Sequence, residues 1–220
     1  MKHTVLLAGA SGEIGKRLTN NLIANNSIGE IHLLSRRPLG FTHEKVVEHI
    51  IDFEMINELS FSHSFDQAFC CLGTTIKQAG SQQEFYHVDY THCVNFAKFA
   101  ARHQCRNLSV ISSLGANPKS NNFYLQTKGA MEKAMQSLDW QTLLIFRPSL
   151  LVGKRAEFRI SERLGGYILQ LLSPLMIGPL RRYRPIQMSC VAKAMSLMVA
   201  PKKVTSKIIE SNEINRIAKG

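Results

Sequence analysis

Tyr124 and Lys128 are the two residues of this chain whose types and spacing most directly suggest chemistry. They stand four residues apart in a helical pattern, so both side chains lie on one helix face. A neighbouring ammonium group favours the charged form of a phenol, which prepares the phenol for general acid–base catalysis. Ser113 precedes Tyr124 by eleven residues, at the end of a predicted strand, where its hydroxyl can orient a carbonyl oxygen. A surface helix is the better explanation of an isolated YxxxK spacing, so the assignment depends on the surrounding elements.

A glycine-rich turn near the N-terminus is the second candidate site. Gly9, Gly12 and Gly15 follow an apolar strand pattern at residues 5–8 and open a helical pattern. In a strand–turn–helix unit such glycines allow the tight turn, the approach of phosphates and close packing of the helix on the strand. The helix dipole then favours an anion at this end. We predict a pyrophosphate site here, with a purely structural turn as the alternative. The other binding residues expected in the turn are Ser11, Glu13 and Ile14.

Two arginines stand where the second strand is expected to end. An NAD site usually places Asp or Glu about 20 residues beyond the glycines, to bind the ribose 2′-hydroxyl. Here that position holds Ser35, followed by Arg36 and Arg37. Guanidinium groups suit a phosphate, so the pattern predicts NADP(H), with its 2′-phosphate, as the cofactor. A basic turn before Pro38 is the structural alternative.

Two further segments are expected to complete the cofactor site. Asp52 and Phe53 follow the third predicted strand and are placed to contact the adenine. The turn after the fourth strand is expected to run along the ribose and phosphates; its residues are Cys71, Leu72, Gly73 and Thr74.

Short apolar runs alternate with helical patterns along the chain. The predicted strands are residues 5–8, 31–35, 46–51, 67–71, 108–111 and 142–146. The main predicted helices are residues 13–25, 82–103, 124–138, 161–172 and 191–199. This alternation predicts an α/β fold, a Rossmann-type doubly wound parallel sheet built from about residues 1–150. The chain is expected to be one domain, residues 1–220, in which about 150–190 form a small C-terminal substrate lobe.

Composition excludes several other classes of protein. The five cysteines lack CxxC spacing and the eight histidines lack HxH or HxxxH spacing, so we expect reduced thiols and no metal site. The apolar stretches are too short for a membrane span, and no signal peptide is evident, so a cytoplasmic location is expected.

The net charge of +11 belongs mainly to the C-terminal third, where residues 147–220 carry 14 Lys and Arg against four Asp and Glu. Such asymmetry can indicate an anionic partner, and a solvated basic face explains it equally well. Nucleic acid is not an expected partner, because residues 181–184 alone combine basic and aromatic side chains. The long helices at 82–103 and 124–138 leave a homodimer open.

Taken together, these motifs resemble the short-chain dehydrogenase/reductase superfamily in its atypical, extended branch. The segments 9–13, 70–75, 112–116 and 124–129 are similar to the Tat-interacting-protein (TIP30, CC3) family of oxidoreductase-like proteins, and the chain is interpreted as a bacterial member. The resemblance implies that Tyr124 is the acid/base, that Lys128 anchors the nicotinamide ribose and that Ser113 positions the substrate. It also places Arg147, after the sixth strand, beside the cofactor.

The resemblance leaves two functions open. The first is an NADPH-dependent oxidoreductase that transfers hydride to an unidentified carbonyl-like substrate. The second is a regulatory protein that senses NADP(H) redox state with little turnover. Many catalytic relatives carry an asparagine that supports a proton-relay water, and this chain has Asp89 at the corresponding place. An aspartate can hold water there, or it can mark the absence of the relay.

Overall fold

The fold is built around a parallel sheet of seven strands. A computed structural model describes residues 2–153, 178–199 and 205–220. The strand order is β3-β2-β1-β4-β5-β6-β9, and every neighbouring pair in it is parallel. The strands span β1 His3–Ala8, β2 Ile28–Ser35, β3 Val46–Ile50, β4 Gln67–Cys70, β5 Asn107–Ile111, β6 Thr142–Arg147 and β9 Thr205–Glu210. The predicted doubly wound, Rossmann-type fold is therefore confirmed.

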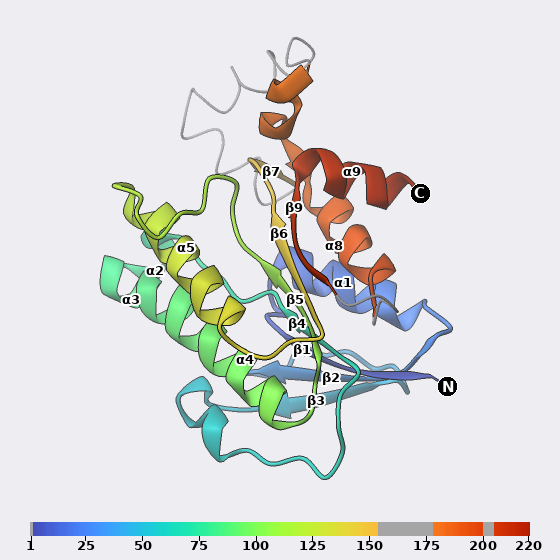
Figure 1. The fold of residues 1–220 in the computed structure, drawn as a ribbon. Coiled ribbons are helices and arrows are strands. Elements are labelled where there is room, and N and C mark those ends of the chain that lie inside the picture. Colours follow the sequence, from blue (N-terminus) through green and yellow to red (C-terminus); the bar gives the residue numbers. More distant parts are fainter. Residues whose placement is uncertain (1, 154–177, 200–204) are drawn as a thin grey trace.

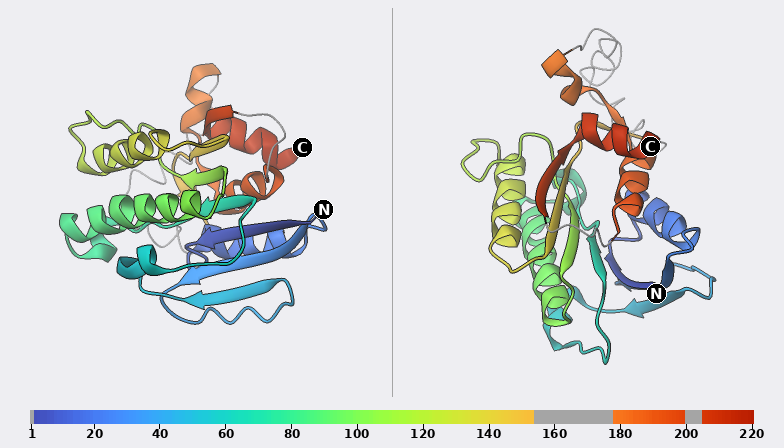
Figure 2. Two further views of the ribbon diagram at one scale, coloured as in Figure 1. Left: turned by 60° about the horizontal axis from the view of Figure 1, so that its bottom comes forward. Right: turned by 45° about the vertical axis from the view of Figure 1, so that its right-hand side comes forward.

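Helices cover both faces of the sheet (Figures 1 and 2). Side chains of α1 (Glu13–Ile23), α8 (Met188–Leu197) and α9 (Ser211–Lys219) pack into the apolar core on one face. Side chains of α4 (Cys93–Arg102) and α5 (Phe123–Gln136) pack into the core on the other. In β1, Val5 and Leu7 belong to the first core, and Leu6 and Ala8 to the second. Burial on both faces explains why the strand sequence is apolar without alternation.

The long helix expected at residues 82–103 has three consecutive parts. It consists of α3 (Gln82–Tyr86), a π-helical segment η2 (His87–His92) and α4. The wider π turns change which side chains share a face, so the middle of this helix departs from α-helical spacing. Two short helices precede it, the 3₁₀ helix η1 (Phe53–Glu58) and α2 (Ile76–Ala79).

The sheet extends beyond residue 150, which corrects the expected boundary. Strand β9 pairs with β6 along its whole length, from Thr142 opposite Thr205 to Arg147 opposite Glu210. Near it lie a two-stranded sheet, β7 (Leu151–Val152) and β8 (Ile186–Gln187), and the 3₁₀ helix η4 (Gly178–Tyr183). Most of the predicted substrate lobe, including the helix expected at 161–172, lies outside the described residues.

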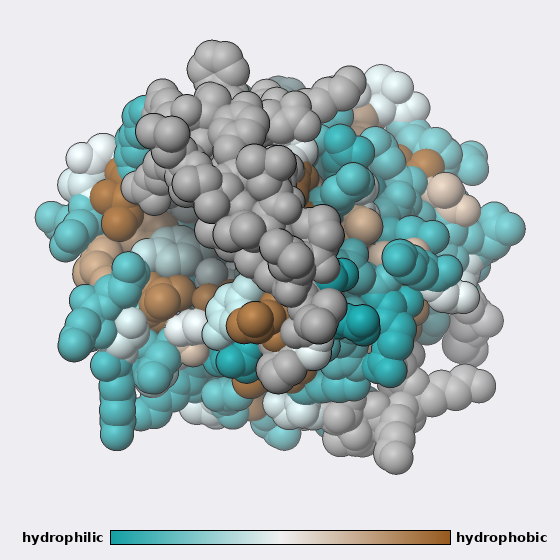
Figure 3. Space-filling model, turned by 90° about the horizontal axis from the view of Figure 1, so that it is seen from above, coloured by the Kyte–Doolittle hydropathy of each residue, from teal (hydrophilic) through white to brown (hydrophobic). Residues whose placement is uncertain are grey.

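One face of the molecule is shown from above in Figure 3. On this face, the apolar side chains of the described residues form separate spots among hydrophilic ones. Within the described ranges, each helix is too short or too polar to cross a membrane.

Candidate active site

The glycine turn lies at the centre of the sheet, where the strand order reverses. β1 is flanked by β2 on one side and β4 on the other. In open α/β sheets ligands bind beyond the carboxyl ends of the strands at such a reversal. Gly9 has a φ of +92°, and a Cβ atom there would lie 2.4 Å from the carbonyl carbon of Cys71. A Cβ atom on Gly15 would lie 2.2 Å from the Gly9 oxygen. These two glycines therefore let the turn pass between β4 and helix α1.

Helix α1 begins at this turn with an uncapped N-terminus. Its N-cap is Gly12, and no side chain accepts a hydrogen bond from the first N–H groups. Ser11 and Gly12 are exposed. The only acid in the first turn, Glu13, forms an ion pair with Arg17 at 2.6 Å, which offsets its negative charge. Free N–H groups at the positive end of the helix dipole are suited to bind a phosphate.

A cavity of about 650 Å³ lies beside the ends of β2 and β3. It contains two of the residues predicted to bind the adenosine end of a cofactor, Arg36 and Asp52, and both are exposed. The side chain of Asp52 also caps η1 by accepting a hydrogen bond from the Glu54 N–H. Phe53, by contrast, is 4% exposed and packs against His92, so its ring belongs to the core. The remaining lining residues are Glu54, Gln83, Glu84, Tyr86, His87, Val88 and His92.

Lys128 and Asp89 form a buried ion pair beside the turn after β4. Lys128 Nζ lies 2.7 Å from Asp89 Oδ1, and the other carboxylate oxygen accepts a hydrogen bond from the Thr74 N–H at 2.8 Å. The two side chains are 5% and 1% exposed. Asp89 thus connects helix α5 to the turn that follows β4. A Cβ atom on Gly73 would lie 3.3 Å from Asp89 Oδ1, so this turn packs directly against the pair.

The charges around Lys128 keep it protonated. Burial lowers the pKa of its ammonium group, but the combined effect of Asp89, Tyr124 and Cys93 is larger and raises that pKa above the ordinary value of 10.5. A buried positive charge is therefore held at a fixed position at neutral pH. Tyr124 is one of the groups that interact with it electrostatically, as the spacing in α5 predicts.

Tyr124 and Ser113 are both partly exposed. The Tyr124 ring packs against Phe85, with ring centroids 5.5 Å apart. Ser113 lies in the loop just beyond β5. The next residue, Leu114, donates its N–H to the Pro148 oxygen at 2.9 Å, and this hydrogen bond holds the loop against the end of β6. The Ser113 hydroxyl lies 3.5 Å from the Leu114 oxygen, a weak contact that leaves it available to another acceptor.

Arg147 is engaged inside the protein. Its Nε lies 2.9 Å from Glu132 Oε1 and its Nη2 lies 2.5 Å from Glu132 Oε2, a two-pronged ion pair between β6 and α5. The Glu132 side chain is 4% exposed. Arg147 therefore fixes the helix that carries Tyr124 and Lys128, and its contact with a cofactor stays a prediction.

The structure thus brings the predicted residues into three places along the carboxyl edge of the sheet. The glycine turn meets the turn containing Cys71 and Leu72, Lys128 meets Gly73 and Thr74 through Asp89, and Arg36 shares a cavity with Asp52. Arg37 is exposed and fixed in its turn by the Ser35 hydroxyl, which donates to the Arg37 oxygen at 2.7 Å. Between Ser113 and Tyr124, both within the described residues, the structure shows no hydrogen bond.

Sequence reasoning missed two partners and one packing glycine. Asp89 and Glu132 are the acids that hold Lys128 and Arg147, and no local spacing indicates either pair. Gly129 follows Lys128 directly, and a Cβ atom there would lie 2.3 Å from the carbonyl carbon of Asn117. Only glycine allows α5 to pack this closely on the loop that contains Asn117. A glycine directly after the lysine of the motif is therefore the sequence feature that could have indicated this packing.

Comparison with known proteins adds relatives over most of the chain. No family model matches it. The chain is 36% identical over 163 residues to Protein HTATIP2 of Rattus norvegicus; the alignment covers 72% of this chain and 67% of the relative. It is 30% identical over 198 residues to Protein FMP52, mitochondrial, of Candida albicans; this alignment covers 86% of this chain and 85% of the relative. These relatives are eukaryotic and do not support the expected bacterial origin. The word mitochondrial in the second name leaves the expected cytoplasmic location without support.

Solved structures share the fold at low sequence identity. MoeE5 in complex with UDP-glucose and NAD has a TM-score of 0.68 at 17% identity, over 98% of this chain and 80% of that one. WbmG of Bordetella bronchiseptica in complex with NAD has a TM-score of 0.66 at 13% identity, over 100% and 77%. At this identity the likeness concerns the fold.

Proposed function

Because the chain belongs to the family of HTATIP2 and FMP52, an atypical family within the short-chain dehydrogenases/reductases, we propose that it is an NADPH-dependent oxidoreductase. Its substrate would be a carbonyl-like compound. The observation that carries the proposal is the buried Asp89–Lys128 ion pair, because it fixes a positive charge on the helix face of Tyr124, beside the turn after β4.

The residues present fit a nicotinamide dinucleotide. Gly9 and Gly15 let the turn pack closely between β4 and α1, and the uncapped start of α1 offers N–H donors to a pyrophosphate. Arg36 and Arg37 would hold a 2′-phosphate at the adenosine end. Cys71, Leu72, Gly73 and Thr74 would line the ribose and phosphates. NAD in the related solved structures is consistent with this class of cofactor, and the choice of NADP(H) rests on the arginines.

The bound cofactor would supply the hydride, and the protein would supply the proton. In reduction, the Tyr124 phenol donates its proton to the developing alkoxide oxygen of the substrate. The Lys128 ammonium group stabilises the phenolate that remains, and it is held in place for this role by Asp89. Ser113 would donate a hydrogen bond to the same substrate oxygen. Arg147 and Glu132 hold α5 against β6, so the phenol keeps its position relative to the sheet.

The same ion pair also favours a second candidate function. The Asp89 carboxylate offsets much of the field of the Lys128 ammonium group, and an ammonium group paired in this way stabilises a phenolate less than an unpaired one. A protein of this kind can bind NADP(H) and report its redox state to a partner while turning over little substrate. The two functions share the cofactor site and differ in whether Tyr124 is needed.

Turnover by Tyr124 variants tests the proposed oxidoreductase. Purified protein is incubated with NADPH and a panel of aldehydes and ketones, and NADPH oxidation is followed by absorbance. We expect turnover with at least one class of carbonyl, and its loss in Tyr124→Phe with NADPH affinity unchanged. Tyr183→Phe is the matched control, because Tyr183 is an exposed tyrosine of η4 and should leave turnover intact.

Two results would count against this proposal. Undiminished turnover in Tyr124→Phe would show that the phenol is not the acid. Tight NADPH binding with no turnover across the panel would favour the redox-sensing alternative.

A further inference from the structure

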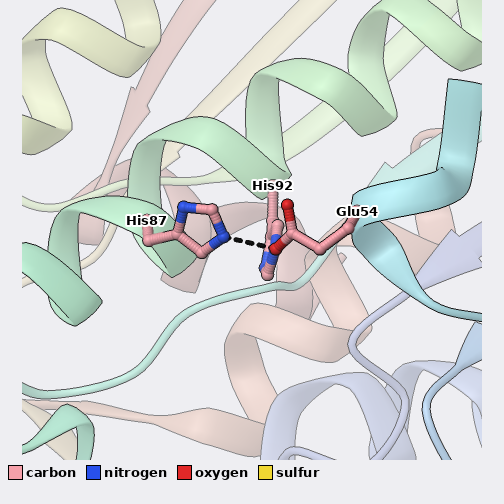
Figure 4. Close-up of side chains that lie close together, drawn as sticks. All are labelled: Glu54, His87 and His92. Carbon is pink, nitrogen blue, oxygen red and sulfur yellow. Dashed lines mark hydrogen bonds and ion pairs between the residues drawn. The ribbon is translucent and has the colours of Figure 1, made fainter.

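Glu54, His87 and His92 form a cluster that the proposed reaction does not use (Figure 4). Glu54 lies on η1, and both histidines lie on the π-helical segment η2. His92 Nε2 is 2.8 Å from Glu54 Oε1, and His87 Nε2 contacts the same oxygen. One carboxylate oxygen and two imidazole nitrogens thus converge, all within 4.8 Å of one another.

The π-helical turn brings the two histidines together. In an α-helix, residues five apart are separated by about 140° around the axis and point in different directions. The wider turn of a π-helix, with hydrogen bonds from residue i to i+5, places such residues on one side. The two rings accordingly lie 4.5 Å apart between centroids. This explains why a search for HxH or HxxxH spacing predicted no metal site.

We propose that Glu54, His87 and His92 form a binding site for a divalent transition-metal cation of the zinc type. Two neutral imidazoles and a carboxylate are a ligand set that Zn²⁺ uses when it keeps an open coordination position. Imidazole nitrogen disfavours Mg²⁺ and Ca²⁺, which take oxygen ligands. The site stands on residues of the described chain and does not depend on the proposed function.

The geometry allows the cation to replace the hydrogen bonds that now join the three side chains. Metal–ligand bonds of about 2.0 to 2.2 Å place tetrahedral ligand atoms roughly 3.3 Å apart, so the Glu54 oxygen must move away from each imidazole nitrogen by less than an ångström, while the two nitrogens already lie within 4.8 Å of each other. Glu54 can move, because its side chain is 52% exposed. His92 is the anchored ligand, since its side chain is 11% exposed and its ring packs on Phe53 at 5.6 Å.

The charges of the adjoining cavity also favour a cation. The cavity wall carries the carboxylates of Asp52, Glu54 and Glu84 and one guanidinium group, that of Arg36. The open coordination positions of a bound metal would face this cavity, where water or an anionic ligand could complete the coordination.

Metal titration of the tag-free, EDTA-treated protein tests the proposal. Zn²⁺ alone is titrated by calorimetry, and Co²⁺ is added separately so that its visible absorption reports the coordination geometry. We expect one equivalent of Zn²⁺ to bind with micromolar affinity or tighter. Glu54→Gln and His87→Ala should each weaken binding by at least roughly 10- to 100-fold, because each removes a direct ligand and the loss of an outer-shell partner alone has an effect of that size. Both residues are partly exposed, so these variants should fold.

His63→Ala is the matched control, because His63 is an exposed histidine in a separate group of rings with His32. It should bind Zn²⁺ as the wild type does, and the Co²⁺ spectrum of the wild type should be lost in His87→Ala. The proposal is overturned if the wild type takes up no stoichiometric Zn²⁺ in the micromolar range. It is equally overturned if Glu54→Gln and His87→Ala bind as tightly as the wild type.

Discussion

Asp89 and Lys128 are joined by a buried ion pair of 2.7 Å that connects the π-helical segment η2 to helix α5. The resemblance to short-chain dehydrogenases/reductases predicts an asparagine and a proton-relay water at the position of Asp89. In this chain the carboxylate takes up both the lysine and the Thr74 N–H. The position of Lys128 is therefore set by a charge from another helix, and several measurable consequences follow from that contact.

The first prediction concerns stability. Asp89→Ala leaves the Lys128 ammonium group buried without its counter-ion, and breaking such a pair costs about 3–5 kcal/mol. We expect a loss of this size in the free energy of unfolding, measured by urea titration. Lys98→Ala removes an exposed lysine of α4 and should change stability by less than about 0.5 kcal/mol. An Asp89→Ala protein as stable as the wild type would show that the pair contributes little.

The second prediction concerns the pH dependence of turnover. Asp89→Asn keeps an acceptor for the Thr74 N–H but removes the negative charge beside Lys128. Burial lowers the pKa of Lys128 and Asp89 raises it, so without that charge the pKa of Lys128 falls, and the limb of the pH–rate profile on which Lys128 loses its proton should move to lower pH. The measurement is the pH profile of kcat/KM for a substrate found in the carbonyl panel. A shift to higher pH would contradict the electrostatic account.

The third prediction distinguishes two reasons why Gly9 must be glycine, its positive φ and the lack of space for a Cβ atom. Gly9 and Gly80 both have positive φ, +92° and +85°, but a Cβ atom on Gly80 would meet nothing within 4 Å. Gly80→Ala should therefore cost only the left-handed conformation, about 1–2 kcal/mol, and should leave NADPH binding unchanged. Gly9→Ala must also displace the Cys71 backbone, so we expect a larger loss of stability and no NADPH binding. Equal effects of the two substitutions, measured by urea unfolding and NADPH titration, would refute the steric role of Gly9.

The fourth prediction concerns acid stability. Burial lowers the pKa of His32 and of His49 below the ordinary value of 6.5. His63 lowers both pKa values further and His32 also lowers that of His49, while Glu30 acts in the opposite direction. The unfolded chain then binds more protons than the folded protein below pH 6.5, so the free energy of unfolding falls as the pH drops through this range. His49→Gln should reduce the loss in stability between pH 7 and about pH 5, measured by urea unfolding. Exposed His43→Gln is the control; an unchanged loss in His49→Gln would exclude the buried imidazoles as its cause.

The sheet was predictable to the extent that its elements are local. Residues 5–8 and 142–146 are continuous apolar runs because the strands they predict are buried on both faces, and each pattern recovered a strand to within two residues at either end. Strand β9 was missed because it lies at the edge of the sheet, where Thr205–Glu210 carries few apolar residues. Its pairing with β6 depends on contacts across the chain that no local pattern indicates.

The candidate site divides in the same way. The glycine turn and the Tyr124–Lys128 spacing are local and could be found by motif. The acid that holds Lys128 is 39 positions earlier in the chain, and the acid that holds Arg147 lies on a different element. The His87–His92 pair was invisible for another reason, because its spacing of five has meaning only in a π-helical turn.

The glycine turn and the two arginines, Arg36 and Arg37, are proposed to form a site for NADP(H). Titration of the purified protein with NADPH and with NADH, followed by nicotinamide fluorescence, tests this site. We predict clear preference for NADPH in the wild type, and a much smaller preference in Arg36→Ala/Arg37→Ala, whose affinity for NADH should be nearly unchanged. Equal affinity of the wild type for the two nucleotides, or an undiminished preference in the double variant, would contradict the account.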